Sequence, residues 1–320
     1  MSTVIDKSVK IDFRKRRGQA RGHQTDPQAL HEVKELLGGT SRQRDMLIEA
    51  LHLIQDRYHH LSAKHLVALA DEFSLAPTEV FEVASFYHHF DVIRENESPP
   101  PALTVRVCDS MSCRMAGAED LINELDERFD ESVRVQRVPC VGRCQHAPVA
   151  VVGKNPIDSA DSLRVQQVAL NHETNPVLPV YVDFDAYRAS GGYKFYKSCV
   201  SGERQPEEVI EVLKNSNLRG LGGAGFPTGM KWSIVRNFPE PRLLAINIDE
   251  GEPGTFKDRH FLESDPHRFL EGCIIASWAV GIDQIYLYLR DEYSACRTLL
   301  LKETKELRKD PPGKLPKIHL

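Results

Sequence analysis

The sequence predicts an α/β protein in which a helical preface precedes two α/β units. Three features support this prediction. Between residues 44 and 87, apolar residues recur every three or four positions, the period of an amphipathic helix. Between residues 104 and 152, two alternating segments and one apolar run read as strands, with a helical stretch between the first two. A second series of predicted helices and strands follows residue 180 and indicates a second α/β unit.

The composition is ordinary for a globular protein of two domains. The chain has 320 residues, of which 41% are hydrophobic and 27% charged, and its formal net charge is −5. The negative charge disfavours general nucleic-acid binding. No apolar run reaches the length of a membrane span, and no signal-peptide core follows Met1. We therefore expect a cytoplasmic protein with no nucleic-acid partner and no membrane span.

Residues 1–28 lack a hydrophobic period and contain the basic run RKRR. We expect a flexible, solvated basic arm here. A transit peptide and a subunit-docking arm are the alternatives, and the acids Asp6 and Asp12 count against the transit peptide.

The helical preface contains three predicted helices. The first starts at Arg44 and carries an apolar stripe that includes Leu51 and Ile54. The second follows Ser62, a suitable N-cap, and the third begins at Pro77, because proline suits a first helical turn. The run NESPPP at 96–101 is predicted to be a linker.

The first α/β unit contains predicted strands at 104–108, 133–138 and 148–152 and a helix at 119–129. A composition shift near residue 180 indicates a boundary, and the run SGG at 190–192 is expected to be a flexible joint. The predicted domains are thus residues 29–178 and 179–320. The second unit is predicted to contain helices at 206–215 and 266–280 and strands at 243–248 and 285–289.

Four of the seven cysteines form two close pairs. Cys108 and Cys113 enclose four residues, and Cys140 and Cys144 enclose three. Each pair follows a predicted strand, so loops can turn the thiolates toward one point. Four thiolates satisfy a two-iron, two-sulfur (2Fe-2S) cluster. Gly142, within the second pair, lets the backbone approach such a cluster.

Spacing alone leaves alternatives open. Structural zinc also takes four thiolates, although it favours two-residue gaps. Two disulfides suit an intracellular protein poorly. His146 is close enough in sequence to suggest a Rieske centre, but that centre needs two histidines.

Residues 44–150 resemble the thioredoxin-like two-iron ferredoxin subunit of NADH dehydrogenases. The resemblance covers LHLIQDRY, EVFEVASFYHHF, the C-x4-C pair and PCVGRC. It implies a thioredoxin-like fold for this domain. It also implies that one 2Fe-2S cluster is bound by Cys108, Cys113, Cys140 and Cys144.

The run GLGGAGFPTG contains G-x-G-x-x-G, the pattern of a Rossmann dinucleotide site. That site requires a strand before it and a helix after it. Here a predicted helix precedes the run, and Pro227 and Gly229 argue against a continuous helix from Gly225. The glycines could still let backbone amides approach a ring or a phosphate, with Arg219 nearby. A plain surface loop is the alternative.

The turn NIDEGEPG holds three carboxylates within four residues. Such carboxylates can accept hydrogen bonds from ribose or ribityl hydroxyls, or bind a hard cation. A solvated acidic turn is the third reading.

Together, RGLGGAGFPTGMKW and NIDEGEPGTFKDRHFLESDPHRFLEG resemble the flavin-binding, NADH-oxidising subunit of respiratory NADH dehydrogenases and related enzymes. The resemblance implies an α/β domain that binds FMN and NAD(H) without a standard Rossmann unit. It assigns the cofactor loop, ring stacking, a phosphate contact and polar contacts to Gly220, Gly222, Gly223, Gly225, Phe226, Lys231, Asn247, Asp249, Glu250 and Glu252.

The fusion of both modules in one chain most resembles the beta subunit of NAD-dependent formate dehydrogenase. This resemblance is one of overall likeness, which includes the segment VDFDAYRASGGY. Diaphorase subunits of NAD-reducing hydrogenase or NADH:quinone dehydrogenase are the runners-up. The implied partner is a catalytic, metal-containing oxidoreductase subunit. A non-enzymatic two-iron electron-transfer or docking protein, and a zinc-stapled interaction domain, are the other classes. No catalytic acid or base is expected.

The family pattern continues past Leu320 with a glycine- and glutamate-rich segment and a C-x-x-C-x-x-C run. Neither occurs in this sequence, so the resemblance implies a truncated flavin module. Cys199, Cys273 and Cys296 are too far apart to form that run.

Overall fold

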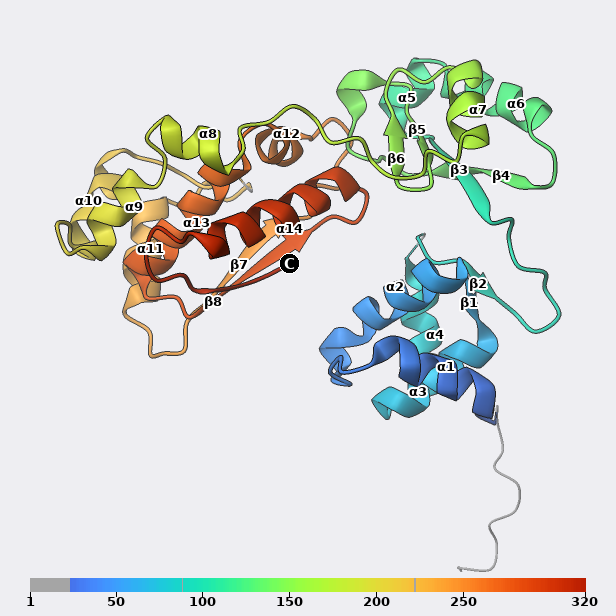
Figure 1. Ribbon diagram of the computed structural model, residues 1–320, viewed down its shortest axis with the longest axis horizontal. Helices are drawn as coiled ribbons and strands as arrows, with labels where there is room; N and C mark the ends of the chain where they lie inside the picture. Colours follow the sequence, from blue (N-terminus) through green and yellow to red (C-terminus); the bar gives the residue numbers. More distant parts are fainter. Residues whose placement is uncertain (1–23, 88, 222) are drawn as a thin grey trace, which may run out of the picture. The chain divides into compact units, whose positions relative to one another are not determined.

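The computed structural model describes residues 24–87, 89–221 and 223–320 (Figure 1). The chain divides into two compact units between Ala102 and Leu103, directly after the predicted proline-rich linker. Most of the expected basic arm lies outside the described residues. Its expected end at residue 28 is too late, because Asp26 accepts the amides of Gln28 and Ala29 and starts a helix at Pro27.

The first unit consists of helices and one short pair of strands. Its elements are α1 (Pro27–Leu37), η2 (Arg44–Met46), α2 (Leu47–Tyr58), β1 (Leu61–Ser62), α3 (Ala63–Phe73), α4 (Pro77–Phe86) and β2 (Val92–Ile93). The predicted starts of the second and third helices are confirmed, since Ser62 accepts the His65 amide at 3.2 Å and Pro77 opens α4. The first predicted start, Arg44, begins the short turn η2, and α2 itself starts at Leu47. Leu51 and Ile54 are fully buried in its core.

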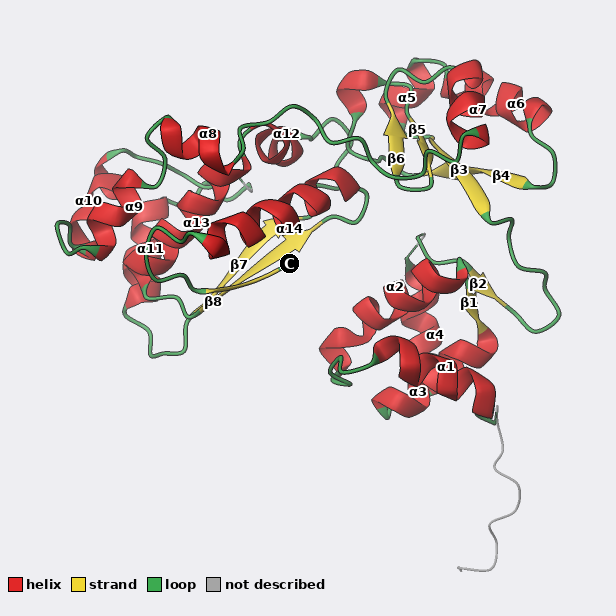
Figure 2. Cartoon of the chain, viewed as in Figure 1, coloured by secondary structure: helices red, strands yellow, loops and turns green. Residues whose placement is uncertain are grey.

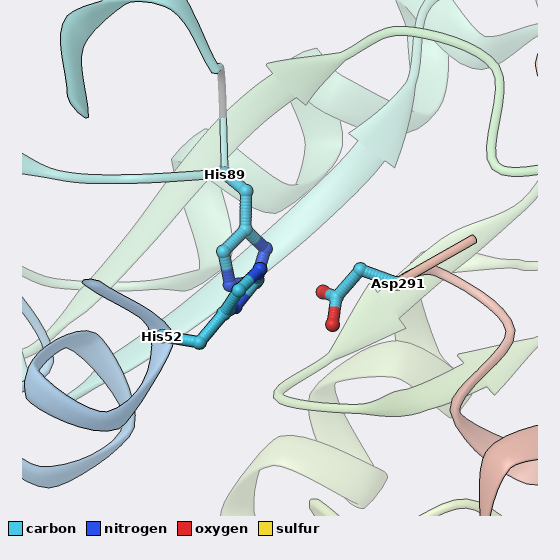
Figure 3. Close-up of side chains that lie close together, drawn as sticks. All are labelled: His52, His89 and Asp291. Atoms are coloured by element: carbon cyan, nitrogen blue, oxygen red, sulfur yellow. The ribbon is translucent and has the colours of Figure 1, made fainter. Parts of the chain in front are cut away.

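Aromatic rings hold the segment after α4 against α2. The His52 ring lies beside that of His89, with centroids 4.9 Å apart (Figure 3). Its centroid is also 4.9 Å from that of the Phe90 ring. Phe90 belongs to the core cluster of this unit. The aromatic end of EVFEVASFYHHF therefore contributes to packing within the first unit.

The second unit begins with a four-stranded sheet of order β4-β3-β5-β6, in which β3 pairs parallel with β4 and antiparallel with β5 (Figure 2). Its elements are β3 (Leu103–Cys108), α5 (Met111–Met115), α6 (Ala118–Arg128), β4 (Val133–Val138), η3 (Cys144–His146), β5 (Ala150–Val152), β6 (Asn155–Ile157) and α7 (Ser162–Leu170). Val105, Val107 and Leu125 are fully buried between sheet and helices. The predicted strands and helix of this region are confirmed.

A second sheet of order β7-β8-β9 is entirely parallel. Its elements are β7 (Leu243–Ile248), α12 (Lys257–Ser264), α13 (Pro266–Val280), β8 (Gln284–Leu289), α14 (Ser294–Lys309) and β9 (Lys317–His319). Apolar residues of α13 and α14 pack with Ile248, Ile285 and Leu287 on one face of the sheet. Because parallel strands end at one edge, the segments after β7 and β8 emerge side by side.

Between α7 and the second sheet, the described residues form α8 (Phe184–Ala189), α9 (Lys194–Val200), α10 (Pro206–Asn215) and α11 (Thr228–Arg236). The expected flexible joint at 190–192 is a packed turn between α8 and α9. The Gly192 amide donates to the Tyr187 carbonyl at 2.9 Å, and a Cβ on Gly192 would lie 2.2 Å from the Tyr187 ring. Gly192 is therefore explained by the close approach of the Tyr187 ring, which leaves no room for a side chain, and not by a need for a flexible joint.

As expected, no helix continues from Gly225, although a separate helix starts three residues later. α11 starts at Thr228 with Pro227 as its N-cap residue. A Cβ on Gly229 would lie 2.5 Å from the Lys214 backbone nitrogen, so this glycine lets α11 approach α10. The helix before the run, α10, is as predicted, so no strand leads directly into the glycines.

None of the helices in the described ranges has the length and apolarity needed to cross a membrane. The domain boundary expected between residues 178 and 179 stays a prediction.

Candidate functional site

The four paired cysteines come together in the second unit. Cys108 ends β3 and Cys113 lies in α5, while Cys140 follows β4 and Cys144 begins η3. The sulfurs of Cys140 and Cys144 are 3.3 Å apart. Cys108, Cys113 and Cys140 are buried, and Cys144 is partly exposed. The two loops that follow neighbouring parallel strands therefore present four thiols to one place.

Contacts among the cysteines shift the pKa values of their thiols. The hydrogen bond between Cys108 and Cys113 raises the pKa of Cys108 and lowers that of Cys113. A hydrogen bond to Cys108, followed by burial, raises the pKa of Cys140. The contacts thus run from Cys113 through Cys108 and Cys140 to Cys144.

Backbone amides surround these sulfurs. The Gly142 amide donates to the Cys140 sulfur at 3.3 Å, and the Gly254 amide donates to the Cys144 sulfur at 3.1 Å. A backbone hydrogen bond from Val149 adds to the lowering of the Cys113 pKa, and one from Ser110 opposes the larger effect of Cys113, which keeps the pKa of Cys108 raised. Four thiols with amide donors at each sulfur are a donor set that suits an iron–sulfur cluster.

Gly142 is required by its backbone angle and by its neighbour. Its φ is +71°, and a Cβ there would lie 2.5 Å from the ring and hydroxyl of Tyr293. Tyr293 is 2% exposed and precedes α14, so the cysteine loop packs directly on the second sheet's connections.

We expect Gly142→Ala to lower the free energy of unfolding of the second unit by about 1–3 kcal/mol more than Gly117→Ala does. Gly117 also has a positive φ, +92°, but a Cβ added to it would have no atom within 4 Å. Gly117→Ala therefore measures the cost of backbone strain alone, without overpacking. Both tryptophans, Trp232 and Trp278, lie in the second unit, so their fluorescence during denaturant unfolding measures the difference. Equal losses for the two variants would contradict the packing explanation.

The acidic turn follows the carboxyl end of β7, and its members differ in exposure. Asn247, Asp249 and Glu252 are exposed, and the Asn247 side chain accepts the Asp249 amide at 2.9 Å. Glu250 is only 3% exposed. The exposed members have polar groups available to a ligand at the strand edge.

The Glu250 carboxylate is already occupied by protein donors. It accepts the Asp258 amide at 3.1 Å and the Tyr293 hydroxyl at 3.0 Å. Burial raises the pKa of Glu250, but the Asp258 amide and Tyr293 hydroxyl lower it more, so that it lies below its ordinary value. The structure therefore gives Glu250 the role of an anchor for the turn.

The glycine run forms a closed, exposed loop. The Gly220 amide donates to the Phe226 carbonyl at 3.0 Å, and the Arg219 guanidinium donates to the Gly225 carbonyl at 3.1 Å. Gly223 and Gly225 have φ values of +94° and +59°. Gly222 lies outside the described residues. The loop leads into α11, whose first turns carry the exposed Lys231.

Phe226, the residue that closes this loop, is 42% exposed. An exposed aromatic ring beside glycines with positive φ is an arrangement that a flat ring system can approach closely.

His146 lies beside the cluster loop without joining the cysteines. Its Nε2 is 3.8 Å from the Asp158 carboxylate, which is also bound by Arg143 at 2.6 Å. This histidine is a polar neighbour of the site.

Sequence reasoning missed four residues that reach the cysteine loop from the second sheet: Gly254, Arg259, Arg290 and Tyr293. Their only sequence signal was position, since Arg290 and Tyr293 directly follow the predicted strand at 285–289.

Two domain families match this chain. Residues 33–172 match the thioredoxin-like 2Fe-2S ferredoxin family, and residues 213–318 match the Nuo51 FMN-binding domain. The chain thus contains one domain of each kind, as the resemblances implied.

Curated relatives match part or most of this chain. The HoxS alpha subunit of the NAD-reducing hydrogenase of Cupriavidus necator is 30% identical over 83% of this chain and 49% of its own length. The F subunit of the NADH-quinone oxidoreductase of Aquifex aeolicus is 46% identical over 39% of this chain and 29% of its own length. This chain therefore spans half or less of these relatives.

A solved structure has a similar fold. The NAD⁺-reducing NiFe hydrogenase in its H₂-reduced state aligns with a TM-score of 0.68 and 28% identity, covering 87% of this chain and 51% of that one.

Proposed function

Because this chain combines a thioredoxin-like 2Fe-2S ferredoxin domain with an Nuo51 FMN-binding domain, we propose that it is a diaphorase-type electron-transfer subunit. It passes electrons between NAD(H), FMN and iron–sulfur clusters. The observation that carries the proposal is the convergence of four thiols, one of which, Cys144, accepts a backbone amide from the turn after β7.

Each region of the chain has a part in this function. Cys108, Cys113, Cys140 and Cys144 hold the cluster in a buried place that excludes most water. When bound, FMN exchanges a hydride with the nicotinamide, and the cluster carries single electrons. The protein's own residues then bind and orient the cofactors, with no side chain required as an acid or base.

The FMN and nicotinamide residues are proposed on the exposed loop and turn. Gly220, Gly223 and Gly225 supply backbone that a ring or phosphate can approach, and Phe226 supplies a stacking surface. Asn247, Asp249 and Glu252 supply polar contacts, and Lys231 a positive charge for phosphate, while Gly222 is expected in the same loop. Glu250 contributes by orienting the turn.

The electron partner is proposed to be a catalytic, metal-containing subunit. The fusion of both domains is shared with a relative named as a hydrogenase subunit, which favours a hydrogenase-like partner. A formate dehydrogenase partner rests on the sequence resemblance alone. The names of the NADH-quinone oxidoreductase relatives make a quinone oxidoreductase the third option.

Anaerobic purification followed by metal and cofactor analysis tests the proposal. Iron, acid-labile sulfide and FMN in the protein, with cluster reduction on adding NADH, are the expected result. Iron and sulfide without FMN, even after reconstitution with FMN, would support a two-iron electron-transfer protein. Zinc without iron would contradict both.

We expect Gly225→Val to lower FMN occupancy at least roughly tenfold. A Cβ added to Gly225 has no protein atom within 4 Å, so the valine side chain would occupy the space proposed for the cofactor. Gly202→Val is the matched control, since Gly202 also has a positive φ, +83°, and an open Cβ position. FMN fluorescence released from equal amounts of protein measures the occupancy. Equal occupancy in both variants would contradict the placement of the cofactor at this loop.

A further inference from the structure

Residues from the second sheet's connections touch the loop that carries Cys140 and Cys144. The Gly254 amide donates to the Cys144 sulfur at 3.1 Å. Arg259 donates from Nε to the Gly142 carbonyl at 3.1 Å, and Arg290 donates from Nη2 to the Cys140 carbonyl. The flavin-binding family region thus supplies groups to the cluster loop of the ferredoxin region.

Arg290 is the more directly placed of the two arginines. It follows β8, is 7% exposed, and donates to the backbone carbonyl of the cluster ligand Cys140. Its Nη1 also donates to the Glu250 carbonyl at 2.6 Å. One guanidinium therefore ties the acidic turn to the cysteine loop.

The charge of Arg290 is only partly balanced by its ion-pair partner. Glu292 accepts from Arg290 at 2.9 and 3.0 Å, but its side chain is 42% exposed and is screened by solvent. The guanidinium itself lies in a buried environment, where a charge acts more strongly on its neighbours. Removing it would leave Glu292 without its ion-pair partner and would take this donor away from the Cys140 and Glu250 backbone carbonyls.

We propose that Arg290 is a positioning residue that raises the reduction potential of the 2Fe-2S cluster, acting with the Gly254 amide. This inference rests on the proposed function, because it requires the cluster. Reduction adds one electron and one negative charge to a cluster already held by four thiolates. A buried positive charge and amide donors to sulfur both favour the reduced state.

The test is a redox titration of the full chain, followed by electron paramagnetic resonance of the reduced cluster. In Arg290→Gln, the ratio of reduced to oxidised cluster at a fixed potential is expected to fall about tenfold, equivalent to about 59 mV for a one-electron couple. Arg290→Lys keeps the charge and is expected to stay close to the wild-type ratio.

Two further variants separate charge from structural damage. Glu292→Gln removes the opposing charge at an exposed position and is expected to shift the ratio in the opposite direction. Arg236→Gln is the matched control, since Arg236 also donates to a backbone carbonyl, that of Ala279 at 2.7 Å, and pairs with Glu207. It is expected to leave the ratio unchanged.

The outcomes distinguish this inference from the proposed function. If the wild-type chain binds no iron and sulfide, the proposed function itself is wrong. If the variants hold full clusters and Arg290→Gln keeps the wild-type ratio, the role of Arg290 is wrong. If Arg290→Gln does not retain its cluster, the result for Glu292→Gln decides, and an unchanged ratio there overturns the inference.

Discussion

Replacing Cys140 with alanine is expected to remove the 2Fe-2S cluster almost completely. Cys140 is 2% exposed, and its sulfur lies at the centre of the thiol series, in contact with both Cys108 and Cys144. Alanine offers no ligand atom, and the buried position leaves little room for a replacement ligand from solvent. We therefore expect iron and sulfide content to fall more than about tenfold, together with loss of the visible absorption of the cluster.

Cys199→Ala is the matched control for this variant. Cys199 is also 2% exposed, and it lies in α9, outside the two cysteine loops. It should retain wild-type iron and sulfide. FMN content measured in the same samples separates loss of the cluster from loss of the fold. Stoichiometric iron and sulfide in Cys140→Ala would contradict the assignment of this cysteine as a ligand.

The helices and strands that could be predicted from the sequence are mostly those determined by residues close together in the chain. The strand at 133–138 alternates, and the helix after Ser62 has both a cap and a period, so neither depends on distant residues. The failures have tertiary causes. Gly229 reads as a helix breaker, but it sits in α11 because only glycine allows α10 to approach so closely.

The four cysteines of the candidate site could be singled out because they occur as two close pairs in short motifs. The role of Glu250 could not, because its carboxylate resembles those of Asp249 and Glu252 in sequence. Only the fold shows that it is buried and accepts the Tyr293 hydroxyl. The contact of Arg290 with Cys140 could not be predicted either, because it joins residues 150 positions apart in the sequence.

Breaking the buried pair of His267 and Glu303 is expected to cost the second unit about 3–5 kcal/mol of unfolding free energy. His267 is fully buried, and its Nε2 lies 2.7 Å from the Glu303 carboxylate, while its Nδ1 lies 2.7 Å from the Tyr193 hydroxyl. His267→Ala leaves Glu303, 1% exposed, with the Tyr181 hydroxyl at 2.7 Å and Lys302 at 3.5 Å but without its buried partner. Tryptophan fluorescence during denaturant unfolding measures the loss.

Two control variants test whether burial is the cause. Glu306→Gln breaks the pair of Glu306 with Lys309 on the surface of α14, and it should change the unfolding free energy by less than about 1 kcal/mol. Replacing both His267 and Glu303 with leucine should recover much of the loss, because no buried charge is then left unpaired. A loss in His267→Ala no larger than that in Glu306→Gln would refute the importance of the buried pair.

The same pair predicts a pH dependence. Burial raises the pKa of Glu303, but the hydrogen bonds from His267 and Tyr181 lower it more, so that the pKa in the folded state lies below its ordinary value of 4.5. A carboxylate with a lowered pKa contributes stability that is complete above the unfolded pKa and disappears as the pH falls through the folded pKa. The wild-type unit should therefore lose stability as the pH drops below about 4.5, the ordinary value. Glu303→Gln cannot titrate at this position, so its unfolding free energy should fall less steeply over the same pH range, and parallel curves would show that other carboxylates cause the loss.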